Sequence, residues 1–281
     1  TIDSELSGNM IDICPVGALT SKPFRYSART WEMSRRRSVS PHDSTGANLV
    51  IQVKNHRVMR VIPFENEAVN ECWIADRDRF SYEALNSAER LTQPMLKQGG
   101  EWKTVDWQTA LEYVVNGLVD IKSQHGANAI GLLASPHSTV EELYLAGALV
   151  RGLGSKSIDY RLRNAEHVVA GGVRWLGRSI ASLSVVDRVL IVGSNLRKEH
   201  PLFAQRIRQA AKRGAKVYSV GSTRAEDWAL ALQGAVQISA AEWFAELGKI
   251  ATAVAVLKDV PAPTSAEADD AATAVAKALV S

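Results

Sequence analysis

Apolar residues recur along the chain with two periods, and the period changes near residue 85. Residues 48–62 are rich in β-branched and apolar side chains around Asn55-His56, a pattern typical of a β-hairpin that ends at Pro63. Beyond residue 85, helical spacing alternates with short apolar runs that are typical of buried strands. The pattern therefore predicts a small β-rich unit followed by a larger α/β region.

The clearest cycle in the larger region is a strand, a helix and a second strand. Residues 187–193 form an apolar run, a helix is expected between Pro201 and Gly214, and residues 215–220 form the next run. Proline suits the first turn of a helix and glycine the position just beyond its end. A strand–helix–strand unit of these lengths implies a right-handed crossover between parallel strands. The sequence thus predicts an α/β fold with a largely parallel sheet.

Further helices are expected on either side of an apolar run at residues 129–134. Asp106 can cap a helix that runs to Lys122, and Ser138 with Glu141 forms a candidate capping box for the next helix. The tail after residue 242 is alanine-rich and should be helical, with a break at Pro261 and Pro263. The first helix carries an apolar stripe that we expect to be buried, formed by Ala110, Leu111, Val114, Val115, Leu118 and Ile121.

Composition narrows the class of protein. The chain has 281 residues, of which 46% are hydrophobic and 22% charged, an ordinary globular balance. Its net charge of +3 argues against a dedicated nucleic-acid binder, and the basic run Arg35-Arg36-Arg37 is expected to be a solvated loop or a subunit contact. No stretch approaches the roughly 20 apolar residues that span a bilayer, so direct membrane insertion is not expected. Two distant cysteines indicate a reducing compartment.

Cys14 is the first residue that could carry chemistry. A cysteine followed by proline is often the last ligand of a ferredoxin-type iron–sulfur motif, although a lone Cys-Pro also fits a buried structural thiol. Residues 8–24, Gly-Asn-Met-Ile-Asp-Ile-Cys-Pro-Val-Gly-Ala-Leu-Thr-Ser-Lys-Pro-Phe, and the following 25–32 closely resemble the end of a ferredoxin-like domain. That domain belongs to the large iron–sulfur subunit, of the G or 75 kDa type, of NADH:quinone oxidoreductase (respiratory complex I).

The resemblance implies that Cys14 is a metal ligand. In that family this cysteine completes a [4Fe–4S] cluster whose other three cysteines lie upstream. A tetranuclear cluster needs about four ligands and this chain supplies one, so the chain is expected to be a fragment that lacks the N-terminal cluster-binding part. No catalytic residue and no residue binding an organic cofactor is assigned.

A second resemblance covers the β-rich unit. In molybdenum and tungsten bis-pterin enzymes this unit often holds another [4Fe–4S] cluster through Cys-x2-Cys-x3-Cys and a later fourth cysteine. The matching positions here are Ser40, Asp43, Ala47 and Ala75, so the cluster ligands are expected to be lost. Cys72 is interpreted as a buried structural thiol. A catalytic or hard-metal role for Ser40, His42 and Asp43 is the weaker alternative to a polar turn.

The α/β region resembles the molybdopterin oxidoreductase domain at residues 106–111, 192–195 and 200–202. In true molybdoenzymes the turn matching Gly193-Ser194-Asn195 helps to hold the nucleotide tail of the cofactor, and a plain tight turn is the alternative. No metal-ligating cysteine or serine stands where molybdoenzymes place it, so no molybdenum cofactor is expected. Arg161 and Arg163 are expected to be ion-paired or to lie in an interface.

These observations predict a domain order of residues 1–30, 31–84 and 85–281: the end of a ferredoxin-like [4Fe–4S] domain, a β-rich subdomain, and an incomplete molybdopterin-oxidoreductase-like domain. The resemblance implies a peripheral-arm segment of an enzyme that moves electrons from NADH towards quinone. The segment would be mainly a scaffold, without catalysis of its own, bound to other peripheral-arm subunits on the cytoplasmic side of a bacterial inner membrane. The alternatives are a free-standing molybdopterin oxidoreductase of the formate dehydrogenase type and a nucleotide-binding α/β module.

Overall fold

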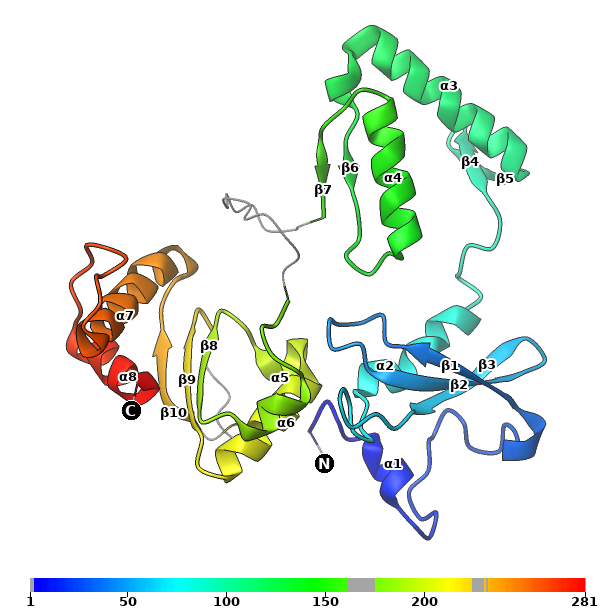
Figure 1. Ribbon diagram of the computed structural model, residues 1–281. Helices are drawn as coiled ribbons and strands as arrows, with labels where there is room; N and C mark the ends of the chain where they lie inside the picture. Colours follow the sequence, from blue (N-terminus) through cyan, green and yellow to red (C-terminus); the bar gives the residue numbers. More distant parts are fainter. Residues whose placement is uncertain (1–2, 161–174, 224–229, 231, 281) are drawn as a thin grey trace. The chain divides into compact units, whose positions relative to one another are not determined.

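A computed structural model describes residues 3–160, 175–223, 230 and 232–280 (Figure 1). The chain divides into two compact units. The first combines residues 1–83 with residues 174–281, and the second comprises residues 84–173. None of the described helices is both long and apolar enough to cross a membrane. Arg161 and Arg163 lie outside the described residues.

The first part of unit one is a three-stranded antiparallel sheet of order β1-β2-β3. The predicted hairpin is confirmed, and Asn55 and His56 both adopt positive φ (48° and 61°), as a tight turn between twisted strands requires. The three arginines form an exposed edge strand, so the expectation of a loop was wrong: Arg35 pairs with Gln52 across the sheet. Bounds are α1 (Asn9–Ile13), η1 (Thr30–Glu32), β1 (Ser34–Val39), β2 (Asn48–Lys54), β3 (Arg57–Pro63), α2 (Asp76–Phe80) and η2 (Ser81–Asn86).

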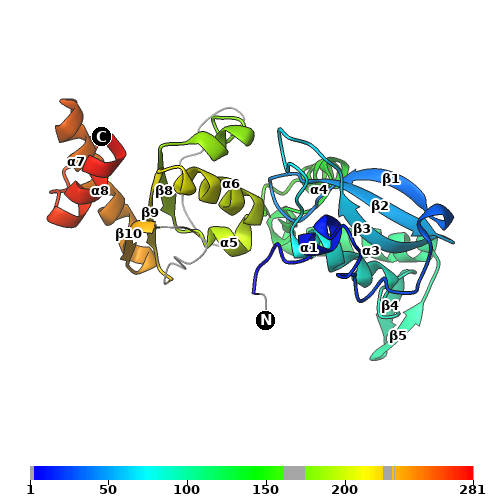
Figure 2. The same ribbon diagram turned by 90° about the horizontal axis from the view of Figure 1, so that it is seen from below.

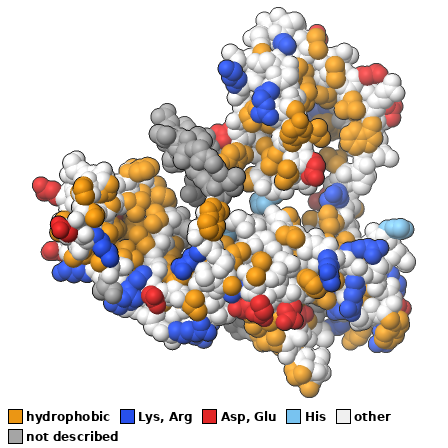
Figure 3. All heavy atoms as spheres, in the orientation of Figure 1, with side chains coloured by type: hydrophobic (Ala, Val, Ile, Leu, Met, Phe, Trp, Pro, Cys, Tyr) orange, Lys and Arg blue, Asp and Glu red, His pale blue; other side chains and the backbone are white. Residues whose placement is uncertain are grey.

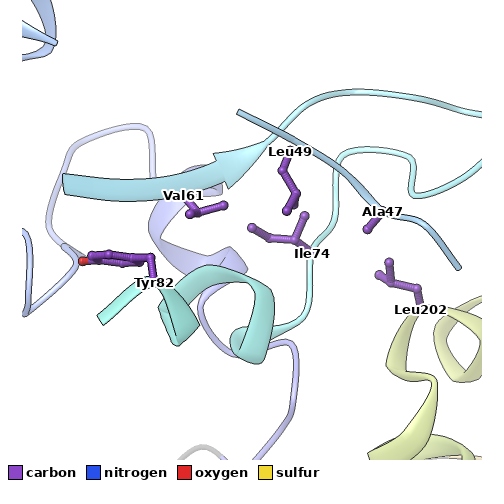
Figure 4. Packing of buried hydrophobic residues seen from close by; sticks show 6 residues of the cluster. All are labelled: Ala47, Leu49, Val61, Ile74, Tyr82 and Leu202. Carbon is purple, nitrogen blue, oxygen red and sulfur yellow. The ribbon is translucent and has the colours of Figure 1, made fainter. Parts of the chain in front are cut away.

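One apolar cluster joins this sheet to the segments around it. Leu49 and Val61 project from β2 and β3 onto Ile74, which is fully buried, while Leu202 reaches the cluster from α6 (Figure 4). Burial of such side chains stabilises a fold by about 1.5–3 kcal/mol each. The cluster therefore ties the β-rich part to residues 174–281 within the same unit. Its buried members are Ala47, Leu49, Val61, Ile74, Tyr82 and Leu202.

The second part of unit one is a parallel sheet of order β10-β9-β8, which confirms the predicted parallel strand–helix–strand unit. Helix α6 covers one face and helices α7 and α8 cover the other (Figure 2). Val217 faces α6 and Val220 faces α7 and α8, as alternation along a strand requires. Bounds are η4 (Ala181–Val185), β8 (Arg188–Val192), α5 (Leu196–Glu199), α6 (Pro201–Lys212), β9 (Lys216–Gly221), β10 (Leu232–Gln237), η5 (Ala240–Glu242), α7 (Trp243–Lys258) and α8 (Asp270–Val280).

Unit two contains one antiparallel hairpin, one short parallel pair of strands and two helices among its described residues. Its predicted capping box was wrong by one residue: Thr139, not Ser138, caps α4, and its backbone amide donates to Glu142 Oε2 at 2.8 Å. The apolar run at 129–134 shrinks to the two residues of β6. Bounds are β4 (Met95–Gln98), β5 (Glu101–Thr104), α3 (Trp107–His125), η3 (Ala127–Ala129), β6 (Leu132–Leu133), α4 (Val140–Gly152) and β7 (Ile158–Asp159).

The apolar stripe of α3 is exposed, which corrects the expectation that it is buried. Leu111 is 57% exposed and Val115 56%, and no residue of the helix is buried. A helix buries its stripe only against another element, and among the described residues α3 packs mainly on the short η3 turn. Apolar side chains consequently gather on the surface of this unit, at the upper right of Figure 3.

Candidate iron–sulfur ligand and its surroundings

Cys14 ends the short helix α1 and begins a tight turn. Its backbone is extended (φ −75°, ψ 104°), Pro15 follows, and Gly17 takes a positive φ of 66°. This path brings backbone amides to the half-buried sulfur: hydrogen bonds from Leu19 first, then Ala18, Val16 and Gly17, lower the pKa of the thiol. A thiolate is the form that ligates iron, and amide donors to sulfur are a feature of iron–sulfur sites. The turn is therefore built to favour a thiolate.

Helix α1 is held on the segment that follows β3. The side-chain Nδ2 of Asn9 donates to the backbone oxygen of Ile74 at 2.8 Å, and its Oδ1 accepts from the backbone amide of Ile74 at 3.1 Å. Both hydrogen bonds are buried. The Asp76 carboxylate accepts from Ser7 Oγ at 2.5 Å and from Gly8 N at 2.7 Å. Its five residues make α1 too short to be a stable helix in isolation. These contacts fix its position and that of the cysteine at its end.

Arg79 completes this attachment with a buried charge. Its side chain, 5% exposed, forms an ion pair with Asp12 and donates to Asn9 Oδ1 at 3.3 Å. Gly8 allows the close approach, because a Cβ there would lie 2.7 Å from Arg79 Cδ. Residues 74–79 are thus a seat for the Cys14 segment. Sequence reasoning missed this seat, since nothing in the spacing links residues more than sixty positions apart.

The four positions that match a second cluster are filled with other interactions. Ala47 and Ala75 are each 1% exposed, and Ala47 lies in the apolar cluster. Ser40 Oγ donates to Asp78 Oδ1 at 2.5 Å. Burial, opposed by that hydrogen bond and reinforced by the charge of Asp43, raises the pKa of Asp78. The side chains at these positions offer one hydroxyl, one carboxylate and two methyl groups, which do not suit iron–sulfide.

Asp43 occupies the remaining one of these four positions. Its carboxylate pairs with Arg77 and accepts a hydrogen bond from Thr45 N at 2.8 Å. His42 lies within 2.7 Å of Ser81 Oγ, so Ser40, His42 and Asp43 each have a different partner. The geometry is that of a polar turn and brings no catalytic set together. Among the described residues no group of three or more His, Cys, Asp or Glu could hold a metal ion.

The turn Gly193-Ser194-Asn195 makes local contacts at the end of β8. Gly193 has a φ of +64°, and a Cβ there would overlap the indole of Trp243. Ser194 Oγ donates to Glu199 Oε2 at 2.6 Å, and the Asn195 side chain caps α5. The Trp243 indole thus packs directly against the backbone at Gly193. This geometry favours the tight-turn interpretation.

Cys72 is exposed, so its interpretation as a buried thiol was wrong. Partial desolvation, together with the charges of Glu71, Glu65 and Glu67, raises its pKa. An exposed thiol with a raised pKa lacks the electropositive surroundings that favour a thiolate. Cys14 and Cys72 thus have opposite electrostatic environments.

Three family models match the chain. The molybdopterin oxidoreductase model matches residues 90–257, the NADH-ubiquinone oxidoreductase NDSU1/NuoG-like 4Fe-4S domain matches residues 33–83, and the ferredoxin-like domain of NADH-quinone oxidoreductase subunit 3 matches residues 1–20. The fold also resembles that of acetylene hydratase from Pelobacter acetylenicus, with a TM-score of 0.57 over 80% of this chain and 32% of that one, at 14% identity. The chain belongs to the molybdopterin oxidoreductase family.

Within that family the similar proteins are subunits of one respiratory enzyme. The chain is 35% identical to the G subunit of the NADH-quinone oxidoreductase of Rickettsia typhi (79% of this chain, 32% of that protein). It is 37% identical to the NADH-ubiquinone oxidoreductase 75 kDa subunit of Reclinomonas americana (79% and 34%). It is 33% identical to the mitochondrial 78 kDa subunit of Candida albicans (92% and 38%). The expected resemblance to the large iron–sulfur subunit of complex I is confirmed, and the chain spans about a third of these relatives' length.

Proposed function

We propose that this chain is part of the peripheral-arm iron–sulfur subunit of an NADH:quinone oxidoreductase, in which electrons pass from NADH towards quinone. Cys14 would supply one thiolate of a [4Fe–4S] cluster, with the other ligands outside these 281 residues. The observation that carries the proposal is the match of residues 1–20, which include Cys14, to the ferredoxin-like domain of NADH-quinone oxidoreductase subunit 3. The backbone of the turn after Cys14, which lowers the pKa of the thiol, supports it. A bound cluster would carry one electron at a time, while residues of this chain would hold and orient one corner of it.

The rest of the segment would serve as a scaffold without catalysis of its own. The division into residues 1–30, 31–84 and 85–281 is part of this proposal. The exposed apolar side chains of α3 and α4, such as Val115 and Tyr144, support contact with other peripheral-arm subunits, because apolar patches of this kind mark interaction sites. We place the subunit on the cytoplasmic side of a bacterial inner membrane.

Neither a molybdenum cofactor nor a second cluster is part of the proposal. The Trp243 indole packs against Gly193, in the turn that would hold a nucleotide tail, and this argues against a free-standing molybdopterin oxidoreductase and against a nucleotide-binding module. The packed alanines and the Ser40–Asp78 hydrogen bond argue against a cluster in the β-rich part. The chain purified anaerobically should therefore hold less than about 0.5 iron, whereas about four irons or stoichiometric molybdenum would contradict the proposal.

The role of Cys14 is tested in the assembled complex with two matched variants. Cys14→Ala should remove one tetranuclear electron paramagnetic resonance signal and about four irons per complex, because a cluster seldom persists without a thiolate ligand. Cys72→Ala, which removes the exposed thiol, should leave every signal in place. Retention of all signals in Cys14→Ala would overturn the proposal.

A further inference from the structure

The buried guanidinium of Arg79 lies against the helix that carries Cys14. Arg79 is 4% exposed, and its partner Asp12 stands two positions before the cysteine on α1. The pair is not an isolated surface contact, because Arg79 also donates to the buried Asn9 and fills the space left by Gly8. A charge held in such a place is screened far less by solvent than an exposed one.

Asp12 interacts with two cations, Arg79 and Arg60. Arg60 interacts electrostatically with Asp12, with Arg35 and with Arg79, and its Nε donates to Gln52 Oε1 at 2.5 Å. The sheet and α2 thus present fixed positive charge to the helix, and Asp12 balances part of it. Removing either partner of the Arg79–Asp12 pair would leave the other charge uncompensated beside the Cys14 turn.

A cluster that accepts an electron becomes more negative by one charge. Nearby cations stabilise the reduced form and raise the midpoint potential, and nearby anions lower it, with the effect strongest where the dielectric is low. We propose that the Arg79–Asp12 pair both positions the Cys14 segment and sets the midpoint potential of the cluster that it ligates. This inference rests on the proposed function of Cys14.

The inference predicts shifts of opposite sign, which a purely structural role would not produce. In the assembled complex, Arg79→Gln should move the midpoint potential of the Cys14 cluster to more negative values, because the Asp12 carboxylate loses its counter-charge. Asp12→Asn should move it to more positive values, because the arginines lose theirs. The double variant should return close to the wild-type potential, and Arg79→Lys, which keeps the charge, should change it little.

Redox titration monitored by electron paramagnetic resonance measures these potentials. Lys54→Gln, which breaks an exposed 2.8 Å ion pair with Glu32 in the same unit, is the control and should leave the potential unchanged. Shifts of the same sign in both single variants, or no shift in either, would overturn the inference. Loss of the signal in every variant, Arg79→Lys included, would reduce the pair to structural support and also overturn it. The proposed function is tested by a different variant: it is wrong if Cys14→Ala keeps every tetranuclear electron paramagnetic resonance signal.

Discussion

Replacing Arg206 with glutamine should loosen the attachment of the β-rich part to helix α6. The residue is 5% exposed, and its side chain projects from α6 to the turn that follows β3. It donates to Glu67 O at 2.7 Å and to Val69 O at 3.0 Å, and it reaches Glu71 Oε1 and Ser184 Oγ at 3.3 and 3.2 Å. One buried cation therefore satisfies four acceptors.

The magnitude follows from those contacts. Hydrogen bonds to a charged group contribute roughly 1.5–3 kcal/mol each, but they are not additive, and breaking a buried ion pair costs about 3–5 kcal/mol. Glutamine can keep one of the four bonds, so we expect a loss of about 3 kcal/mol for local opening. That is a large share of the roughly 5–15 kcal/mol typical of a whole domain. Amide exchange in the turn should become about 100-fold faster, since 1.4 kcal/mol corresponds to about tenfold.

Hydrogen exchange read by mass spectrometry is the suitable assay, because it reports each segment and needs no two-state unfolding of a chain with two units. Arg208→Gln changes the same residue type two positions further along α6, where the side chain is exposed, and should alter exchange by less than about 0.5 kcal/mol. Peptides from residues 84–160 should not change in either variant. Equal effects of the two substitutions would refute the assignment of Arg206 as the buried link.

Two further predictions concern the filled cluster positions and the turn after β8. Burial raises the pKa of Asp78 above its ordinary 3.8. As pH rises, the carboxyl group therefore stays protonated to a higher pH in the folded protein than in the unfolded chain. The free energy of unfolding should therefore fall as pH rises from 3.8 through the folded-state pKa. Asp78→Asn should flatten this dependence, as measured by urea unfolding at several pH values. At pH 7 the variant should be more stable by about 1.4 kcal/mol for each unit by which the folded-state pKa exceeds the unfolded one. Gly193→Ala should destabilise the protein by about 2–4 kcal/mol, from positive φ and overlap with Trp243, whereas Gly221→Ala, with open space around it, should cost less than about 1 kcal/mol in thermal unfolding.

Local patterns predicted the elements whose signals are contained in a few consecutive residues. Asn55-His56 between two β-branched runs announced the hairpin, and Pro201 and Gly214 bracketed α6. The proposed role of Cys14 also rests on local signals, because the residues that form its turn adjoin it in the chain. Strand β1 escaped prediction, since its run of arginines has no period of two; it forms because its backbone pairs with β2.

Contacts between distant segments could not be predicted in the same way. The stripe of α3 has the right spacing for burial, but burial depends on an opposing element, and among the described residues its main partner is the short η3 turn. Asn9 and Ile74, or Asp12 and Arg79, find each other through the fold and leave no periodic trace. Residue identity gave the candidate ligand, but only the fold gave its environment.

That environment extends beyond the β-rich part. Despite desolvation, hydrogen bonds from Lys198 and Arg197 hold the pKa of Glu5 below its ordinary value. Arg197 also binds Asp3, so α5 holds the stretch of chain that leads into α1. Arg77 donates to Lys198 O at 3.2 Å from the same α2 helix that carries Arg79. The segment ending at Cys14 is therefore fixed from two sides by cations. The non-cysteine residues at the four positions that match a second cluster leave this seat intact, because hydrogen bonds and ion pairs hold residues 74–79 in place.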